Sequence, residues 1–206
     1  MKEKTKIHFI RHGVVENPER IYYGRLPGFR LGEQGIRQAK AAAKVVSRYP
    51  IAALFSSPLE RAVETAEEIA KQLDNIEIQI SELLLEANTP YEGQPISRLV
   101  ERHWDVYAGT HHPYEQPIDI LERTKAFVTK VRRAYKSQHV IATTHADVIA
   151  FMIAWASGKP ITNDQKQEIH KGYLEYASIT TFVFETDSVN EIPGFTYLVP
   201  KESPRS

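Results

Sequence analysis

Short apolar runs alternate with helical patterns along this chain, and that alternation limits the folds it can adopt. Each run is rich in β-branched and aromatic residues, and the segment after it repeats its apolar residues at helical spacing. Three such strand–helix pairs occur along the chain, at 6–10 with 32–49, 52–56 with 57–73, and 139–143 with 146–157. Strands that alternate with helices form layers around a parallel sheet. We therefore predict an α/β fold, a three-layer α/β/α sandwich with a mainly parallel central sheet.

The remaining segments complete one predicted domain over residues 1–206. Residues of about 87–117 are rich in Pro, Gly, His and Tyr and contain one short helical pattern at 97–107. This composition predicts a small cap-like excursion over the carboxyl ends of the strands. The tail, 200–206, is expected to be frayed. Further elements are expected as a helix at 119–135 and strands at 76–80, 178–185 and, with a weaker pattern, 195–199.

The start of the second predicted helix carries a sequence signal of its own. Ser57 suits the N-cap, Pro58 the first helical position and Glu60 the third position after the cap. We therefore predict that this helix begins immediately after Ser57.

The composition narrows the classes of partner and of chemistry. Lys plus Arg and Asp plus Glu each number 26, so no global field attracts nucleic acid or an anionic membrane. Cysteine is absent, which rules out disulfides, thiolate nucleophiles and cysteine-based zinc sites. No apolar stretch resembles a signal peptide or reaches transmembrane length. We expect a cytoplasmic protein that binds neither nucleic acid nor membranes; the sequence makes no prediction of its oligomeric state.

Two arginines and two histidines are expected to meet at one edge of the sheet, because ligands of such sheets bind beyond the carboxyl ends of the strands. Arg11 and His12 directly follow the first strand, Arg61 lies in the first turn of the helix after the second, and His145 joins a later strand to its helix. Taken singly, Arg61 could instead be a surface arginine and His145 a helix cap. Their common position favours a shared site.

Such a group suits phosphoryl transfer. Guanidinium groups match a phosphate dianion through bidentate hydrogen bonds, and helix N-termini add backbone N–H donors. An imidazole among these cations is held neutral and can attack phosphorus. A second, protonated histidine would complete the clamp on the phosphate oxygens.

Several motifs, in this order, resemble those of the histidine phosphatase superfamily, the phosphoglycerate-mutase-like group. The resemblance implies that His12 is the nucleophile, that Arg11, Arg61 and His145 clamp the phosphate, and that Glu86 protonates the leaving oxygen. It also implies a phosphohistidine intermediate and no metal or other cofactor. The matching pieces are Phe9-Ile10-Arg11-His12-Gly13, Leu31-Gly32-Glu33-Gln34-Gly35 with Gln38-Ala39, residues 54–62 with Thr65-Ala66, Leu85-Glu86, Tyr91-Glu92-Gly93, and 140–158 around Thr144-His145.

The proton donor is less well defined by the residues alone. Departure of a leaving group needs an acid and attack by water needs a base, and one carboxylate can serve as both. Glu82 and Glu86 both follow the third predicted strand, and Glu92 lies nearby. The resemblance favours Glu86, since Glu92-Gly93 matches a later piece of the pattern, and Glu82 remains the second candidate.

The chain also departs from the family pattern. Val14 and Val15 stand where a Ser or Thr is common, and we assign Asn17 to phosphate binding on the assumption that the loop is one residue shorter. Ala146 replaces the usual Gly after His145 but keeps its backbone N–H for the substrate. Asp147 is unusual there, and is either a carboxylate of the first helical turn or a modulator of His145.

The mutase branch of the family holds a Glu-Arg-His-Tyr-Gly element that is missing here, because Ala87-Asn88-Thr89-Pro90 follows Glu86. We therefore predict a metal-independent phosphatase that hydrolyses a small phosphorylated metabolite, such as a sugar phosphate or sugar-acid phosphate. A mutase-like phosphotransferase and a catalytically inactive phosphate-binding scaffold are the alternatives.

Two groups of residues complete the list of candidates. Tyr23, Gly24 and Arg25, in an aromatic and basic loop near His12, are predicted to contact the substrate, although the aromatic residues could instead pack the loop onto the body. The histidines of the excursion lack a His-Glu-x-x-His spacing, so they are expected to be exposed or to contact substrate rather than to bind a metal. These are His103, His111 and His112.

Overall fold

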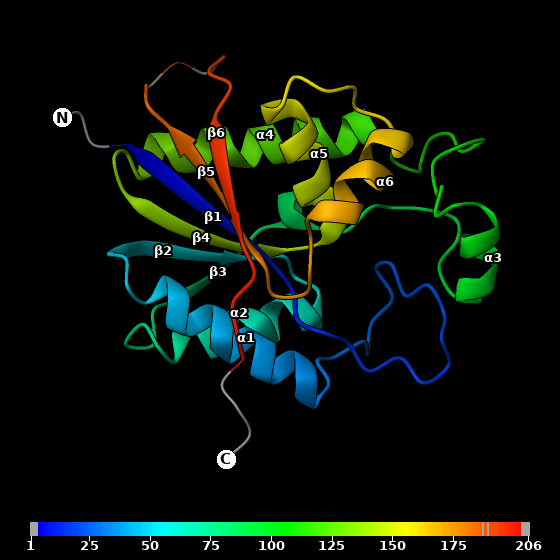
Figure 1. Ribbon diagram of the computed structural model, residues 1–206, viewed down its shortest axis with the longest axis horizontal. Helices are drawn as coiled ribbons and strands as arrows, with labels where there is room; N and C mark the ends of the chain where they lie inside the picture. The colour runs from blue at the N-terminus through cyan, green and yellow to red at the C-terminus, as the bar shows by residue number, and fades with distance from the viewer. Residues whose placement is uncertain (1–3, 187, 189, 203–206) are drawn as a thin grey trace.

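Six strands form one mixed sheet in the computed structural model, which describes residues 4–186, 188 and 190–202 (Figure 1). Their order across the sheet is β3-β2-β4-β1-β5-β6. The predicted α/β class with a mainly parallel sheet is confirmed, because β3, β2, β4 and β1 are parallel and only β5 and β6 run antiparallel to their neighbours. The strands are β1 (Thr5–Arg11), β2 (Ile51–Ser56), β3 (Ile78–Ile80), β4 (His139–Thr144), β5 (Ile179–Phe184) and β6 (Gly194–Leu198).

Helices cover both faces of the sheet. Figure 1 shows α4 and α5 on one side and α1 and α2 on the other. No helix of the described residues is both long and apolar enough to cross a membrane. The helices are α1 (Glu33–Val46), α2 (Glu60–Ala70), the 3-10 turn η1 (Glu82–Leu84), α3 (Ile96–Glu101), α4 (Pro117–Ala134), α5 (Ala146–Ala156) and α6 (Asn163–Gly172).

Two apolar cores hold these layers together, one on each face. On the face of α4 and α5, Phe9 of β1 meets Phe127 and Phe182 edge to face, at centroid distances of 6.1 and 5.5 Å. On the face of α1 and α2, small residues such as Ala42 and Ala66 let the helices lie close to Ile10 of the same strand. Strand β1 is therefore buried on both faces, and only Lys6 and Arg11 are partly exposed.

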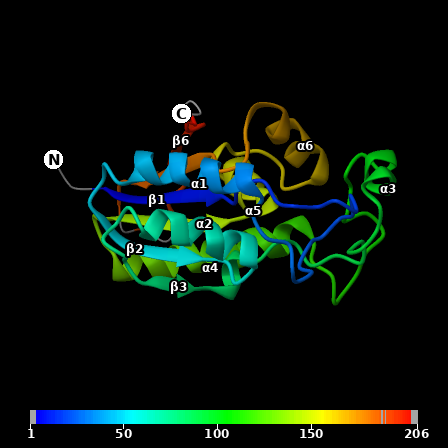
Figure 2. The same cartoon turned by 90° about the horizontal axis from the view of Figure 1, so that it is seen from below.

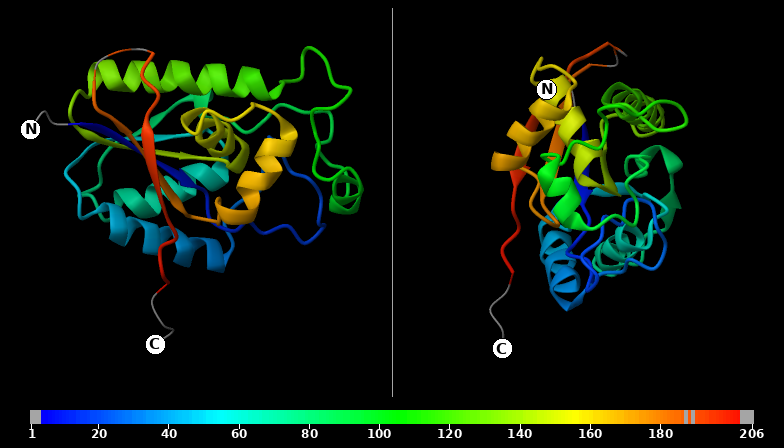
Figure 3. Two further views of the ribbon diagram at one scale, coloured as in Figure 1. Left: turned by 45° about the horizontal axis from the view of Figure 1, so that its top comes forward. Right: turned by 90° about the vertical axis from the view of Figure 1, so that its right-hand side faces the viewer.

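Four parallel strands end at the same edge of the sheet, at the right of Figure 1. The loop after β1 and the excursion between η1 and α4 both extend beyond this edge (Figures 1 and 2). The two segments lie side by side, since Ile21 forms a bridge with Pro95 and the Tyr22 N–H donates to the Gln94 carbonyl at 2.8 Å. Figure 3 shows α6 at the same end, next to α5.

Two helix predictions differ from the structure. Helix α2 begins at Glu60 with Leu59 as its N-cap, so the predicted start immediately after Ser57 is wrong. Helix α3 spans Ile96–Glu101 rather than 97–107, because His103 and Trp104 adopt positive φ angles of 50° and 56°.

Helix α6 was not predicted, because its residues are mostly polar and give little apolar periodicity. Its N-terminus is capped by Thr162, whose hydroxyl accepts from the Gln165 N–H at 3.3 Å. Of the tail expected to be frayed, 200–202 has no regular structure and 203–206 lies outside the described residues.

A buried histidine couples the central strands at the end of the sheet opposite this edge. The Nδ1 atom of His8 lies 2.8 Å from the Thr181 hydroxyl, and its Nε2 lies 3.0 Å from Nδ1 of His139. Tyr49 stacks on both imidazoles at centroid distances of 5.1 Å. Burial, together with the neighbouring His139 and Lys6, lowers the pKa of His8 from its ordinary 6.5 to about 3.

This lowered pKa predicts a pH dependence of stability. Between pH 3 and 6.5 the unfolded chain binds a proton at His8 that the folded chain does not, so the free energy of unfolding should fall as the pH falls below 6.5, by up to about 1.4 kcal/mol per pH unit. Urea unfolding at pH 4.5 and 6.5 should therefore show a smaller pH dependence for His8→Gln than for the unaltered protein. The exposed His111, changed in the same way, is the control, and an unchanged pH dependence in His8→Gln would contradict the assignment.

Candidate active site

A tight backbone contact fixes the loop after β1. A Cβ atom at Gly13 would lie 2.4 Å from the Gly35 carbonyl oxygen, and one at Gly35 would lie 2.1 Å from the Val14 oxygen, so neither position tolerates a side chain. The Gly13 N–H donates to the Thr65 hydroxyl at 3.2 Å, and the Val14 N–H donates to the Gln38 amide oxygen at 2.9 Å. Helices α1 and α2 thus hold the loop that presents His12.

One ring nitrogen of His12, Nδ1, forms a hydrogen bond, and the other, Nε2, forms none with a described residue. Its Nδ1 lies 2.8 Å from the Gly13 carbonyl oxygen, which can only accept a hydrogen bond, so Nδ1 carries the proton and Nε2 keeps its lone pair. Burial, then Arg61 and Arg11, lower the pKa of His12 well below 6.5. The imidazole is therefore neutral at neutral pH and can act as a nucleophile.

His145 is the N-cap residue of α5, and its ring centroid lies 5.3 Å from that of His12. Its Nε2 lies 2.8 Å from the Ser57 hydroxyl, which also accepts from the Leu59 N–H at 3.4 Å. Because the hydroxyl oxygen accepts from Leu59, its hydrogen is free to be donated to Nε2, which assigns the ring proton to Nδ1. The hydroxyl of Ser57 thus serves His145 rather than the N-cap of α2.

The expectation that His145 is protonated does not hold in this structure. Burial lowers the pKa of His145 well below 6.5, and electrostatic repulsion from Arg61 and His12 lowers it further, so the ring is neutral. An anion close to the ring would oppose this effect, because a negative charge favours the protonated form.

Two arginines border the histidines, each held by a carbonyl and an aromatic ring. Arg61 is 1% exposed; it donates to the Gly24 carbonyl at 2.7 Å and lies 4.7 Å from the Tyr23 ring centroid. Arg11 donates to the Leu174 carbonyl and lies 3.9 Å from the Tyr176 ring centroid. Within the described part of the chain, neither guanidinium forms an ion pair with a carboxylate.

Three buried N–H donors have no partner in this group of side chains. They are Nε of Arg11, Nε of Arg61 and Nδ1 of His145, which lack a hydrogen bond to any described residue. An unpaired buried donor costs about 1–3 kcal/mol, so the arrangement is costly unless an anion accepts from these atoms. Both arginines also lower the pKa of both histidines, which places the four groups near one another. The arrangement can bind an oxyanion such as phosphate, whose oxygens would accept from these donors.

Of the three candidate carboxylates, only Glu86 lines the pocket at His12. Glu82 is exposed on η1, and Glu92 accepts the Arg25 N–H at 2.6 Å. The Oε2 atom of Glu86 lies 4.0 Å from Nδ1 of His145. Burial and the negative charge of Asp147 raise the pKa of Glu86 from 4.5 to about 7, so a large fraction of this carboxyl group is protonated at neutral pH.

A network of ions fixes the backbone that carries Glu86. Arg25 Nε and an Arg123 amino group donate to the Glu86 carbonyl at 2.7 and 3.3 Å, and Arg123 also reaches the Leu83 carbonyl at 2.8 Å. Glu115 joins the two arginines at 2.7 and 2.6 Å and accepts the Asn88 N–H at 2.9 Å. These contacts fix the backbone of the loop on both sides of Glu86, at Leu83 and at Asn88.

The predicted substrate contact by Arg25 is therefore not what the structure shows. Its guanidinium is committed to Glu115 and to the Glu86 carbonyl, and it does not line the pocket. Asn17 does line the pocket, but its amide oxygen and nitrogen bond to the backbone of Ile21, at 3.2 and 2.8 Å. Tyr23, Gly24 and Ala146 line it as well.

The pocket has a volume of about 530 Å³ and extends beyond His12; Arg61 and His145 are not among the residues that line it. Its far wall comes mainly from residues that the sequence did not single out. The only sequence signal for this wall was the capping pattern from Thr162 to Gln165 at the start of α6. The wall residues are Ile96, Trp104 and Val106 of the excursion, Lys166, Gln167 and His170 of α6, and Tyr176.

Asp147 lies in the first turn of α5 and pairs with this wall. Its Oδ2 accepts from the Tyr107 hydroxyl and lies 3.3 Å from Nζ of Lys166, and its Oδ1 lies 3.8 Å from Nε2 of His170. Burial alone would raise its pKa, but Lys166 and His170 outweigh burial and lower it. The carboxylate is therefore charged at neutral pH.

The remaining histidine candidates lie elsewhere. His103, His111 and His112 are exposed on the excursion and do not line the pocket. No group of three or more His, Asp or Glu residues close enough to hold a metal ion occurs among the described residues.

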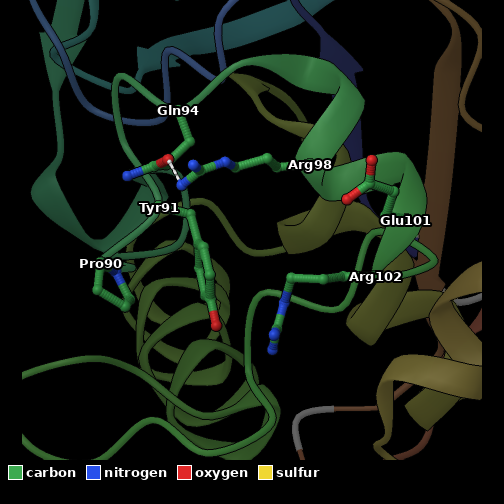
Figure 4. Close-up of a pocket in the computed structure, with 6 residues that line it drawn as sticks. All are labelled: Pro90, Tyr91, Gln94, Arg98, Glu101 and Arg102. Carbon is green, nitrogen blue, oxygen red and sulfur yellow. Dashed lines mark hydrogen bonds between the residues drawn. The ribbon is translucent and has the colours of Figure 1, made fainter.

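A second hollow lies on the excursion and is lined by neither of the two site arginines nor by either of the two site histidines. Figure 4 shows Arg98 extended toward Gln94, to which it donates at 3.0 Å, and Arg102 beside Tyr91, 4.8 Å from the ring centroid. Pro90 and Glu101 complete its lining.

Comparisons with known proteins identify a family with which this chain shares its sequence pattern. The model of the histidine phosphatase superfamily (branch 1) matches residues 7–191. The uncharacterized protein Rv0525 of Mycobacterium tuberculosis is 30% identical over 199 residues, which cover 93% of this chain and 96% of that protein. Phosphoserine phosphatase 1 of Hydrogenobacter thermophilus is 29% identical over 151 residues, covering 68% of this chain and 71% of its own.

Solved structures share the fold at lower identity. Mycobacterial glucosyl-3-phosphoglycerate phosphatase superposes with a TM-score of 0.78 at 21% identity, covering 97% of this chain and 100% of its own. Phosphoserine phosphatase of Entamoeba histolytica, in complex with 3-phosphoglyceric acid, gives 0.72 at 23% identity, with coverages of 93% and 95%.

The ion network predicts that Glu115→Gln loosens the loop around Glu86. Glu115 and Arg123 are 17% and 14% exposed, so removing the central charge should lower the free energy of unfolding by about 2–3 kcal/mol. The N–H groups of Ala87 and Asn88 should exchange with deuterium faster than in the unaltered protein. The matched control on α4 is Glu122→Gln, whose partner Lys125 is at the surface, and it should change stability by less than about 0.5 kcal/mol. Equal effects of the two variants would contradict the role of the network.

Proposed function

Because the chain belongs to the histidine phosphatase superfamily, we propose that it hydrolyses the phosphate monoester of a small metabolite through a phosphohistidine at His12, without a metal ion. One observation carries this proposal: a neutral histidine with a free Nε2 lone pair is grouped with three buried N–H donors that have no partner. A nucleophile beside unpaired donors suits attack on a phosphate whose oxygens those donors bind.

The first step forms the phosphoenzyme. Nε2 of His12 attacks phosphorus while Arg11, Arg61 and Nδ1 of His145 bind the phosphate oxygens. The P–N bond forms as the P–O ester bond breaks, and the leaving oxygen takes a proton from Glu86. The raised pKa of Glu86, about 7, supports this role, since the acid must hold a proton near neutral pH.

The second step releases phosphate. Water attacks phosphorus, the P–N bond breaks, and Glu86, now ionised, accepts the proton of the water. Glu86 is thereby protonated again for the next turnover, and His12 returns to its neutral form. The two guanidinium charges match the charge of a phosphate dianion, which supports catalysis without a metal ion.

The pocket supports a small substrate. Its volume of about 530 Å³ exceeds what a phosphate group alone would fill, and aromatic and polar side chains line the remainder. Relatives named for phosphoserine and for glucosyl-3-phosphoglycerate also support a small phosphorylated metabolite, such as a sugar phosphate or sugar-acid phosphate.

The nucleophile is tested by His12→Ala. With p-nitrophenyl phosphate and a chelator present, kcat/KM should fall by about 10⁴-fold or more, because no other group in the site can take its place. The unaltered protein, quenched during turnover with radiolabelled substrate, should yield an acid-labile phosphoenzyme that the variant lacks. The exposed His103→Ala is the control and should retain full activity. Retained activity in His12→Ala, or loss of activity with the chelator, would refute the mechanism.

The proton donor is tested by Glu86→Gln with leaving groups of different pKa. For an alkyl phosphate, kcat/KM should fall by about 10²–10³-fold, whereas for p-nitrophenyl phosphate it should fall by less than about tenfold, because that leaving group needs no proton. In the unaltered protein, kcat/KM for the alkyl phosphate should fall as the pH rises through about 7, where Glu86 loses its proton. This limb should be absent in Glu86→Gln, and an equal loss on both substrates would contradict the assignment.

A further inference from the structure

We propose that the far wall of the pocket selects an uncharged, hydroxyl-bearing leaving group, such as a polyol or sugar, over one that carries a carboxylate. This inference rests on the proposed phosphatase activity and narrows its substrate class. The polar part of this wall is formed by Lys166, Gln167 and His170 of α6, and Asp147 of α5 pairs with it.

The buried ammonium group of this wall is already neutralised. Lys166 is 3% exposed, and its Nζ lies 3.3 Å from Oδ2 of Asp147 and donates to the Trp104 carbonyl at 3.2 Å. Its contact with the Tyr107 ring, at 4.9 Å from the centroid, further fixes it in place. An incoming carboxylate would have to share a cation that Asp147 already holds.

The charges in the pocket balance without a second anion. In the form of the site in which Glu86 carries its proton, and apart from the imidazoles, the charged groups around the phosphate position and along the wall are three cations, Arg11, Arg61 and Lys166, and one anion, Asp147, a net charge of two. A phosphate dianion cancels that net charge. A carboxylate on the leaving group would leave one negative charge uncompensated beside Asp147. Arg25 and Arg123, which contact the Glu86 carbonyl, are both paired with Glu115 and do not supply the missing charge.

The hydrogen-bonding groups of the wall favour hydroxyls. Oδ2 of Asp147 is occupied by Tyr107 and Lys166, but Oδ1 is 3.8 Å from His170, beyond hydrogen-bond distance, so it can still accept. A substrate hydroxyl can donate to this oxygen, whereas a carboxylate can only repel it. The amide of Gln167 can pair with further hydroxyls.

The apolar part of the pocket suits the carbon skeleton of such a group. Trp104, Ile96 and Tyr22 line it with apolar and aromatic surface, which can pack against the C–H face of a sugar or polyol. One relative of known structure binds 3-phosphoglyceric acid, which carries a carboxylate. The wall described here predicts a different preference for this chain.

Two phosphate esters that differ at one position provide the test. Glycerol 3-phosphate and 3-phosphoglycerate share their phosphate and carbon chain, and differ in having a hydroxymethyl group or a carboxylate at the far end. At pH 7.5 the unaltered protein should show a kcat/KM at least about tenfold higher for glycerol 3-phosphate, a difference that corresponds to about 1.4 kcal/mol. If either ester is too slow to follow, its inhibition constant against p-nitrophenyl phosphate should show the same order.

Variants of the ion pair should move this ratio. Asp147→Asn leaves Lys166 without its counter-charge, so it should lower the ratio about tenfold or invert it. Lys166→Met, a second variant in case the first does not fold, should raise it. Glu168→Gln is the control, because Glu168 pairs with Lys171 on the exposed side of α6 and should leave the ratio unchanged. Since each result is a ratio within one protein, changes in Glu86 or in the folded fraction cancel.

The outcomes separate this inference from the proposed function. Hydrolysis of p-nitrophenyl phosphate together with a preference for 3-phosphoglycerate, or with a ratio that Asp147→Asn leaves unchanged, would overturn the inference alone. Absence of hydrolysis of every ester by the unaltered protein would overturn the proposed function, and with it the inference.

Discussion

A single hydrogen bond, 2.8 Å between Nδ1 of His12 and the Gly13 carbonyl oxygen, determines what this site can do. It assigns the ring proton to Nδ1 and leaves the Nε2 lone pair free. The bond requires that the carbonyl point back at the ring, and the contact of Gly13 with Gly35 and the bond to Thr65 hold it there. Residues that never meet a substrate thus set the chemistry of one nitrogen.

The surrounding charges act on the same nitrogen at some cost in stability. Burial, together with the charges of Arg61 and Arg11, lowers the pKa of His12 and keeps it neutral, and the Nε atoms of both arginines are buried without partners among the described residues. Unpaired buried donors lower the stability of a folded protein, and such local cost is typical of sites prepared for an anion. Each guanidinium is oriented by a carbonyl and an aromatic ring rather than by a carboxylate, so its charge remains available.

What could be predicted from the sequence followed from local patterns. The apolar runs of β1 and β4 marked the strands, and the strand ends marked Arg11, His12 and His145, because burial on both faces leaves a plain sequence signal. Arg25 was misjudged because its partner Glu115 lies 90 residues away, where no local pattern reveals it.

The other misses have the same physical origin. Ser57 has the sequence of an N-cap, but its hydroxyl pairs with His145, 88 residues along the chain. Helix α6 was missed because the residues it buries are few and include Lys166, a side chain that is buried only through its pairing with Asp147. Sequence periodicity gives no information on the pairing of polar groups that lie far apart along the chain.

The position of β1 in the sheet also has a consequence for synthesis. Its neighbours in the sheet are β4 and β5. Strand β1 therefore has no partner strand until His139, 133 residues after Lys6, has been synthesised. At about 5–20 residues per second on the ribosome, that interval is roughly 7–27 seconds. During this time a strand that the folded protein buries on both faces has no partner at either edge, and a chain released early would expose it. The centre of the sheet, and with it the site, is therefore among the last parts of the molecule to close.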